Sequence, residues 1–123
     1  MKIAVTGALG HIGSYLIRHL VVQFPSAKIV IIDNMMTQRF PSLFNLPAEG
    51  NYHFIGEDVK DMDLNKEFSD INVVLHLAAI TDAAGSFERA KELEANNYQS
   101  TLKVANACAE NGSSLIALSS TSV

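Results

Sequence analysis

The chain of 123 residues carries a formal net charge of −4, is 48% hydrophobic and 18% charged, and has one cysteine, Cys108. This length fits one globular domain, and the acidic balance argues against a nucleic-acid-binding or anionic-membrane surface. Cys108 has no partner for an internal disulfide, and the sequence shows neither a signal peptide nor an apolar run near the ~20 residues of a membrane span, so we expect a soluble, cytoplasmic protein.

Short apolar runs alternate with helical patterns, which predicts βαβ units and a parallel sheet. Helical spacing places Ile12, Leu16, Leu20 and Phe24 along one face of the first helix. The predicted elements in chain order are a strand over Lys2 to Thr6, a glycine-rich turn over Gly7 to Gly13, a helix over Ile12 to Phe24, a strand over Lys28 to Ile32, an irregular connection over 34–51, a strand over Tyr52 to Gly56, a short helix over Leu64 to Phe68, a strand over Ile71 to Leu77, a long helix over Phe87 to Glu110 that ends at Asn111 and Gly112, and a strand over Ser114 to Leu118.

Right-handed crossovers and the doubly wound arrangement predict the strand order 3-2-1-4-5, which is an α/β Rossmann fold. Because the sequence stops just after the fifth strand, we expect residues 1–123 to be an incomplete dinucleotide-binding domain. The sixth strand, a catalytic helix and a substrate domain would be missing. The edge of the fifth strand would then be unpaired and would favour self-association.

Three glycines, Gly7, Gly10 and Gly13, recur at a three-residue spacing between the first strand and the first helix. We expect Gly7 to permit a tight turn, Gly10 to let the backbone approach a pyrophosphate, and Gly13 to let the helix pack closely on the strand. The helix N-terminus would offer its N–H groups to the phosphates. An ordinary glycine-rich turn is the alternative, whereas a nucleoside-triphosphate loop is excluded because no Gly-Lys-Ser/Thr ending follows.

An acidic residue, Asp33, follows the second strand, twenty residues after Gly13. A carboxylate at this place can accept hydrogen bonds from the adenosine ribose and repels a 2′-phosphate, which favours NAD over NADP. Arg39 is the only nearby cation. The alternative interpretation of Asp33 is a turn-forming pair with Asn34.

Four further motifs follow in order: Asp58-Val59 after the third strand, His76 to Ala79 at the end of the fourth, Asn97 to Thr101 in the long helix, and Ser119 to Val123 after the fifth. With the glycine loop, they resemble the extended short-chain dehydrogenase/reductases, specifically the NAD-dependent epimerase/dehydratase family with its UDP-glucose 4-epimerase-like members. The resemblance covers essentially the whole chain, with Ser100 in place of the family's usual glycine.

The resemblance implies an NAD cofactor and a nucleotide-sugar substrate. Thr81 stands where galactose epimerases tend to carry a lysine. From the residues alone, Asp58 could instead cap a turn, and His76 is more typical of a structural histidine than of a catalyst. The residues implied to line the cofactor are Gly7, Gly10, His11, Ile12, Gly13, Asp33, Asn34, Met36, Thr37, Asp58, Val59, Leu77, Ala78, Ala79, Thr81, Asn97 and Ser119.

The resemblance also implies hydride transfer at a sugar carbon, with a tyrosine base, a lysine four residues later that lowers its pKa, and a serine that holds the sugar hydroxyl. Ser120 matches that serine. None of Tyr15, Tyr52 and Tyr98 has a lysine four residues on, so we expect this chain alone to bind NAD without turnover. The sequence Ser120 to Ser122, in place of Thr-Asp-Glu, favours an epimerase or reductase over a 4,6-dehydratase.

Two other functions stay open. One is a non-catalytic NAD-binding or regulatory module, and the other is an enzyme of the same fold that acts on a steroid or an aldehyde. The four histidines lack metal-ligand spacing, so no metal is expected. The family resemblance implies a homodimer of the full-length protein through the helix over Phe87 to Glu110, and we expect no nucleic-acid or membrane partner.

Overall fold

The computed structural model describes residues 1–35, 46–48, 50–77 and 87–117. Within these residues, parallel strands form a five-stranded sheet in the order β3-β2-β1-β4-β5, so the predicted Rossmann order is confirmed. The strands are β1 (Lys2–Thr6), β2 (Lys28–Ile32), β3 (Asn51–Ile55), β4 (Val73–His76) and β5 (Ser114–Ala117). The helices are α1 (His11–Gln23), the 3₁₀-helix η2 (Val59–Asp61), α2 (Leu64–Glu67) and α3 (Phe87–Asn111).

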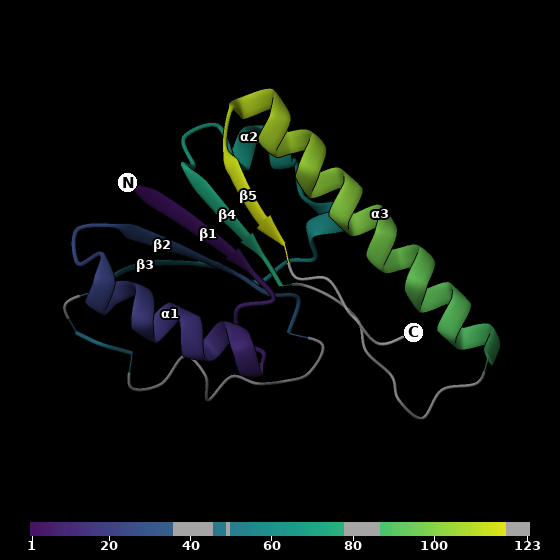
Figure 1. The fold of residues 1–123 in the computed structure, drawn as a ribbon, viewed down its shortest axis with the longest axis horizontal. Helices are drawn as coiled ribbons and strands as arrows, with labels where there is room; N and C mark the ends of the chain where they lie inside the picture. Colours follow the sequence, from purple (N-terminus) through teal and green to yellow (C-terminus); the bar gives the residue numbers. More distant parts are fainter. Residues whose placement is uncertain (36–45, 49, 78–86, 118–123) are drawn as a thin grey trace.

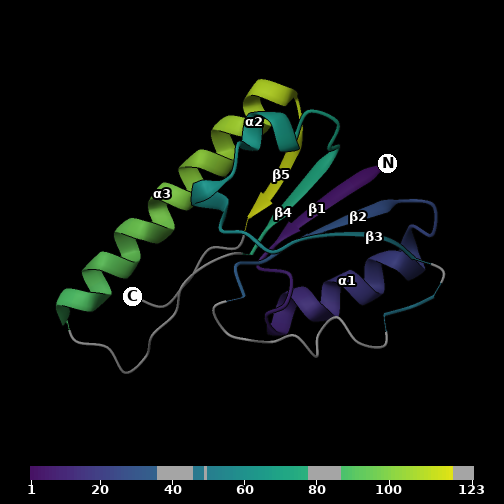
Figure 2. The same cartoon turned by 180° about the vertical axis from the view of Figure 1, so that it is seen from behind.

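Helices cover both faces of the sheet, α1 on one side and α2 with α3 on the other (Figures 1 and 2). The apolar strands supply both cores because successive side chains of a strand point to opposite faces. The core under α1 contains Ile3, Val5, Ile29, Ile31 and Leu75 of the strands with Ile17 and Val21 of the helix. The core under α2 and α3 contains Ala4, Val30, Ile32 and Val74 of the strands with Phe68, Val104, Ala107 and Cys108.

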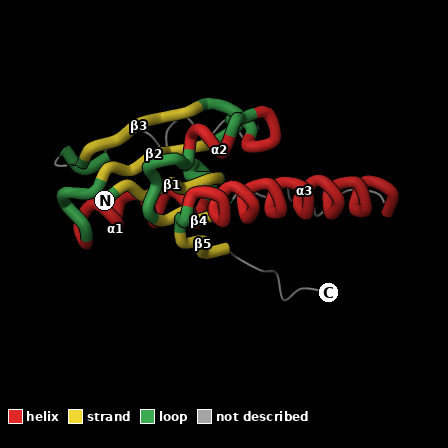
Figure 3. Tube along the Cα trace, turned by 90° about the horizontal axis from the view of Figure 1, so that it is seen from above, coloured by secondary structure: helices red, strands yellow, loops and turns green. Residues whose placement is uncertain are grey.

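The carboxyl ends of the strands meet at one edge of the sheet, where α1 begins (Figure 1). Seen from above, the N-terminal half of α3 extends beyond this edge (Figure 3). In an open α/β sheet, ligands bind outside the carboxyl ends of the strands at the point where the strand order reverses. Here that point lies between β1 and β4, which pair directly although α1, β2 and β3 separate them in the chain.

The buried face of α1 matches the predicted one only in part, since Leu16 and Leu20 are partly buried against the core under α1. Gly13, Ile17 and Val21 face the sheet, whereas Ile12 is 55% exposed and Phe24 is 45% exposed. The helix has apolar residues on more than one side, so periodicity alone did not decide which side packs. The close contact of Gly13 with the preceding turn, described below, sets the rotation of the helix.

Several element boundaries also differ from the prediction. β4 begins at Val73 rather than Ile71, because the Ile71 N–H donates to the Phe68 carbonyl and completes the turn that ends α2. β3 is shifted by one residue to Asn51–Ile55. The helix η2 was not predicted, since it is only three residues long. The end of α3 is confirmed: Gly112, with φ of +69°, follows Asn111 in the left-handed conformation that ends many helices.

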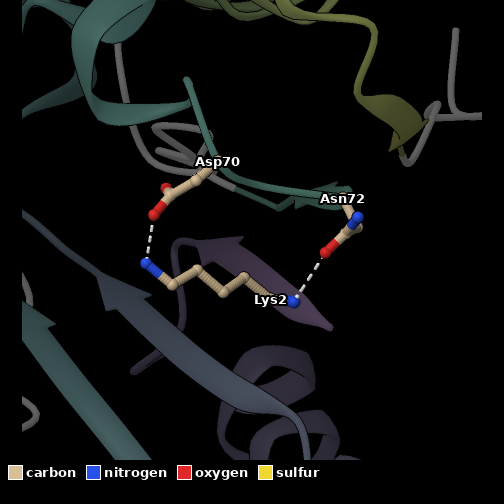
Figure 4. Close-up of polar contacts among 3 residues, drawn as sticks. All are labelled: Lys2, Asp70 and Asn72. Carbon is tan, nitrogen blue, oxygen red and sulfur yellow. Dashed lines mark hydrogen bonds and ion pairs between the residues drawn. The ribbon is translucent and has the colours of Figure 1, made fainter.

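At the opposite, amino edge of the sheet, Lys2 joins β1 to the segment before β4 (Figure 4). Its side chain forms an exposed ion pair with Asp70, and its backbone N–H donates to Asn72 Oδ1 at 2.8 Å. The ion pair holds the pKa of the Asp70 carboxyl below its ordinary value, chiefly through the hydrogen bond from Lys2. These contacts lie far from the carboxyl edge and serve the fold rather than the site.

Two further predictions concern β5 and Cys108. β5 lies at the edge of the described sheet and Ile116 is 58% exposed there, but association through this edge stays a prediction. Cys108 is 3% exposed in the core under α3, and burial raises the pKa of its thiol, as expected for an unreactive core cysteine.

Candidate cofactor site

The turn between β1 and α1 is a compact loop at the carboxyl edge. Gly7 has φ of +67°, a left-handed conformation that favours glycine. Its carbonyl accepts the Gly10 N–H at 3.2 Å, and the Ala8 N–H donates to the Ile32 carbonyl of β2 at 3.3 Å. The loop is therefore bonded within itself and to the neighbouring strand, which fixes where α1 begins.

The other two glycines of the loop differ in what surrounds them. A Cβ at Gly13 would lie 2.5 Å from the Gly7 carbonyl oxygen and 2.7 Å from backbone atoms of Ala8, so the packing of α1 on the loop requires glycine there. A Cβ at Gly10 would meet, among the described residues, the Gly7 oxygen at 3.4 Å, an ordinary contact. The fold itself therefore does not require Gly10, and its bare backbone leaves room for a ligand that approaches the loop.

The N-terminus of α1 is suited to an anion. Gly10 is its N-cap and supplies no side-chain cap, and the first turn contains no acidic residue. The first N–H groups of an α-helix have no acceptor within the helix and carry the positive end of its dipole. His11 and Ile12 are exposed at this end, and α1 begins at the carboxyl edge (Figure 1), so the N–H groups of its first turn could hold a diphosphate.

Asp33 ties the end of β2 to the glycine loop. Its Oδ2 accepts the Leu9 N–H at 3.0 Å and its Oδ1 accepts the Met35 N–H at 2.8 Å. Met35 has φ of +65°, so Asp33 does form a turn, as the alternative interpretation held. A carboxylate oxygen can accept more than one hydrogen bond. The turn role therefore leaves acceptor capacity for the two hydroxyls of a ribose.

Asn34 and Asp58, which were both expected to line the cofactor, are brought together. Asn34 Nδ2 donates to Asp58 Oδ2 at 3.3 Å. Asp58 Oδ1 accepts the Lys60 N–H at 2.9 Å and caps η2, so the turn-capping alternative is confirmed for Asp58. Val59 is 4% exposed and belongs to the core under α3. The Val59 side chain therefore has little surface left for a ligand, and Asp58 is the more accessible member of the Asp58-Val59 motif.

His76 is a buried structural histidine that links three elements. Its Nδ1 lies 2.7 Å from Thr6 Oγ1 of β1, and its Nε2 lies 3.2 Å from Thr101 Oγ1 of α3. Thr6 Oγ1 also accepts the Leu77 N–H at 3.2 Å. Burial lowers the pKa of His76, which favours the neutral ring. Hydroxyls can donate or accept, so a neutral imidazole with one donor and one acceptor nitrogen satisfies both contacts.

Thr6 and Thr101 were missed as site residues from the sequence. Thr6 directly precedes Gly7 of the glycine loop, and Thr101 is the last residue of the motif that starts at Asn97. Asn97 is half-buried on α3, and Leu77 is partly buried against the core under α1. The remaining predicted site residues lie outside the described residues: Met36, Thr37, Ala78, Ala79, Thr81, Ser119 and Ser120.

Neither a metal site nor a membrane-spanning helix is found in the part of the chain that the structure describes. Its His, Cys, Asp and Glu side chains form no group of three or more that could hold a metal ion. Its helices are too short or too polar to cross a bilayer. The groups that the described part of the carboxyl edge offers to a ligand are the backbone N–H groups at the start of α1 and the Asp33 and Asp58 carboxylates.

Comparison with known proteins gives a consistent result. Residues 3–123 match the profile described as the NAD dependent epimerase/dehydratase family. The chain is 37% identical over 117 residues to dTDP-D-glucose 4,6-dehydratase of Mus musculus, which covers 90% of this chain and 32% of that protein.

Solved structures agree. UDP-glucuronic acid 4-epimerase from Bacillus cereus in complex with NAD matches with a TM-score of 0.83 and 34% identity over 100% of this chain and 41% of that one. UDP-N-acetylglucosamine 4-epimerase from Methanobrevibacter ruminantium M1, in complex with UDP-N-acetylmuramic acid, matches with a TM-score of 0.78 and 36% identity over 91% of this chain and 35% of that one. This chain therefore spans 32–41% of the lengths of these relatives.

Proposed function

Because this chain belongs to the NAD dependent epimerase/dehydratase family, we propose that it is the NAD-binding portion of an epimerase-like oxidoreductase that acts on a nucleotide sugar. The observation that carries the proposal is the glycine loop with Asp33. The loop places bare backbone at Gly10 and the N-terminus of α1 beside a carboxylate that already holds the Leu9 N–H. Diphosphate and ribose recognition require these two features side by side.

Different described residues would bind different parts of the cofactor. The backbone from Gly10 to Gly13 would bind the pyrophosphate, and Asp33 would accept the hydroxyls of the adenosine ribose. Asp58 and Asn34, which are joined by a hydrogen bond, would border the adenine ring. His76 does not touch the cofactor in this proposal. It holds the ends of β1 and β4 to α3, so that the loop after β1 keeps its place.

NAD bound here supplies hydride transfer at a sugar carbon. An epimerase or a reductase is favoured over a 4,6-dehydratase because Ser120-Thr121-Ser122 lacks the acidic pair of the dehydratases, although the mouse relative is a dehydratase. Turnover needs a tyrosine with a lysine four residues on, which these 123 residues do not contain. We therefore expect cofactor binding by this chain without activity.

The nucleotide-sugar substrate and the homodimer are proposals for the full-length protein. Tyr98 and Leu102, one turn apart on α3, are 64% and 41% exposed and provide apolar surface for a partner helix. Sedimentation of the full-length protein would test the dimer, and a monomer at micromolar concentration would contradict it.

Calorimetric titration of the folded chain with NAD and with NADP tests the cofactor. We expect binding of NAD and at least about tenfold weaker binding of NADP, because the 2′-phosphate would lie against the Asp33 carboxylate. Asp33→Asn keeps the size of the side chain and should narrow the difference between the two cofactors. A folded chain that binds neither cofactor would refute the proposal.

A further inference from the structure

Lys103 of α3 is hydrogen-bonded to the turn over residues 58–62, which contains Asp58. Lys103 Nζ donates to the Lys60 carbonyl at 2.7 Å and to the Met62 carbonyl at 2.6 Å. Both distances are short, as expected when the donor is charged. Lys60 is the middle residue of η2 and Met62 is its C-cap, and main-chain carbonyls at the end of a helix lack partners within it.

This lysine completes a continuous set of contacts across the adenine end of the site. Asp58 Oδ1 binds the Lys60 N–H, and Asp58 Oδ2 binds Asn34 of the segment after β2. Lys60 is thus held at its N–H by Asp58 and at its carbonyl by Lys103. These two bonds connect Asp58 to α3 through Lys60.

We propose that Lys103 is a positioning residue for the adenine end of the cofactor site, acting through the Lys60 and Met62 carbonyls on the Asp58 turn. The inference rests on the proposed function, because it assumes that Asp58 borders the adenine. It assigns to α3 a supporting role at two places in the site, the glycine loop and the Asp58 turn. Thr101 reaches the loop end of the site through His76, and Lys103, two residues later, holds the adenine end.

Apolar packing does not make this bond redundant. Val59, Met62 and Leu64 are buried against α3, which keeps the segment folded onto the core. Burial of apolar surface is non-directional, however, whereas two hydrogen bonds from one ammonium group fix the orientation of the chain. The α3–α2 contact is secured separately, since Asn111 Nδ2 donates to the Asn65 carbonyl at 3.1 Å. Loss of Lys103 should therefore loosen the Asp58 turn without detaching α3.

The test compares three variants of the chain. Lys103→Met keeps the apolar stem and removes the donors, and Lys103→Arg restores charged donors. As a control, Lys66→Met removes the exposed side chain of a lysine that donates its backbone N–H to Asp63 Oδ1. Calorimetry measures the affinity for ADP-ribose, which contains the adenine half of the cofactor. Amide hydrogen exchange is followed at residues 58–62 and at residues 7–13, and thermal unfolding monitors the fold.

We expect Lys103→Met to weaken ADP-ribose binding about tenfold, which corresponds to about 1.4 kcal/mol, and to speed exchange at residues 58–62 but not at 7–13. Lys103→Arg should recover most of the affinity, and Lys66→Met should bind as the wild type does. Unchanged affinity in Lys103→Met overturns the inference, and so does faster exchange in both segments. A wild-type chain that is folded but does not bind ADP-ribose refutes the proposed function and the inference with it.

Discussion

Alanine at Gly13 and at Gly10 should separate the stability of the fold from the binding of the cofactor. At Gly13 the added methyl would lie 2.5 Å from the Gly7 oxygen and 2.7 Å from two backbone atoms of Ala8. The optimum for such contacts is about 3.5–4.0 Å, so α1 and the loop must move apart by a large part of an ångström. Overpacking of this kind costs about 1–3 kcal/mol, and we expect about 3 kcal/mol because all three contacts are with backbone.

Gly10→Ala is the matched control. Gly10 has φ of −70°, which any residue adopts, and its Cβ would meet the Gly7 oxygen at 3.4 Å. Alanine is a poorer N-cap than glycine, but it also lowers the entropy of the unfolded chain, and the two effects are each about 0.5–1 kcal/mol with opposite sign. We therefore expect nearly unchanged stability and NAD affinity lowered at least about tenfold, because the methyl group stands where the pyrophosphate would approach.

Urea unfolding followed by circular dichroism gives the stability of each variant, and calorimetry gives its NAD affinity. For a domain of this size, 3 kcal/mol corresponds to a fall in melting temperature of roughly 10 °C. The reasoning would be refuted if Gly13→Ala unfolded at the wild-type urea concentration, or if Gly10→Ala lost as much stability as Gly13→Ala. Wild-type NAD affinity in Gly10→Ala would show that the space at this glycine is not used by the cofactor.

Two further predictions concern protons. Because burial lowers the pKa of His76 in the folded state, the unfolded chain binds a proton at this histidine at a higher pH than the folded chain does. Stability is then full above about pH 6.5 and falls below it by up to about 1.4 kcal/mol per pH unit. Urea unfolding between pH 7.5 and 5 should show this slope in the wild type and in His53→Asn, which alters an exposed histidine, but not in His76→Asn; an equal slope in all three would contradict the prediction. For the ion pair, Lys2→Met should raise the pKa of Asp70 toward its ordinary value, since the Lys2 bond is the main cause of the lowering. The Asp70 contribution is present above the unfolded pKa of about 3.9 and is lost as the pH falls through the lower folded value. Carboxyl NMR titration measures this pKa, and an unchanged Asp70 pKa in Lys2→Met would show that the ion pair does not form in solution.

The strand order and the glycine turn before the first helix could be predicted because local signals for them are strong. β1 and β2 were predicted residue for residue, since Gly7, Pro25 and Asp33 mark where the apolar runs begin or end. Gly13 was expected to allow close packing of α1, and the 2.5 Å separation shows the reason.

What the sequence could not predict depends on tertiary contacts. The core-facing side of α1 was wrong at Ile12 and Phe24, because an apolar residue on a helix can face solvent at little cost. The bonds of Thr101 to His76 and of Lys103 to η2 span 25 residues or more. They arise from the placement of α3 over the sheet, which no local pattern encodes. Asp33 and Asp58 have turn roles, which the sequence offered only as alternatives to cofactor binding.

The central position of β1 has a consequence for how the chain folds during synthesis. β1 precedes both of its neighbours in the chain, and the hydrogen-bonded pair Thr6 and His76 is separated by 70 residues. Until β4 emerges, the strand that will form the middle of the sheet has one long edge unpaired, and such edges promote aggregation of nascent chains. Parallel pairing over this separation is also slow. The interval between the synthesis of β1 and that of β4 is therefore when this part of the chain is most prone to aggregate, before the glycine loop has its full support.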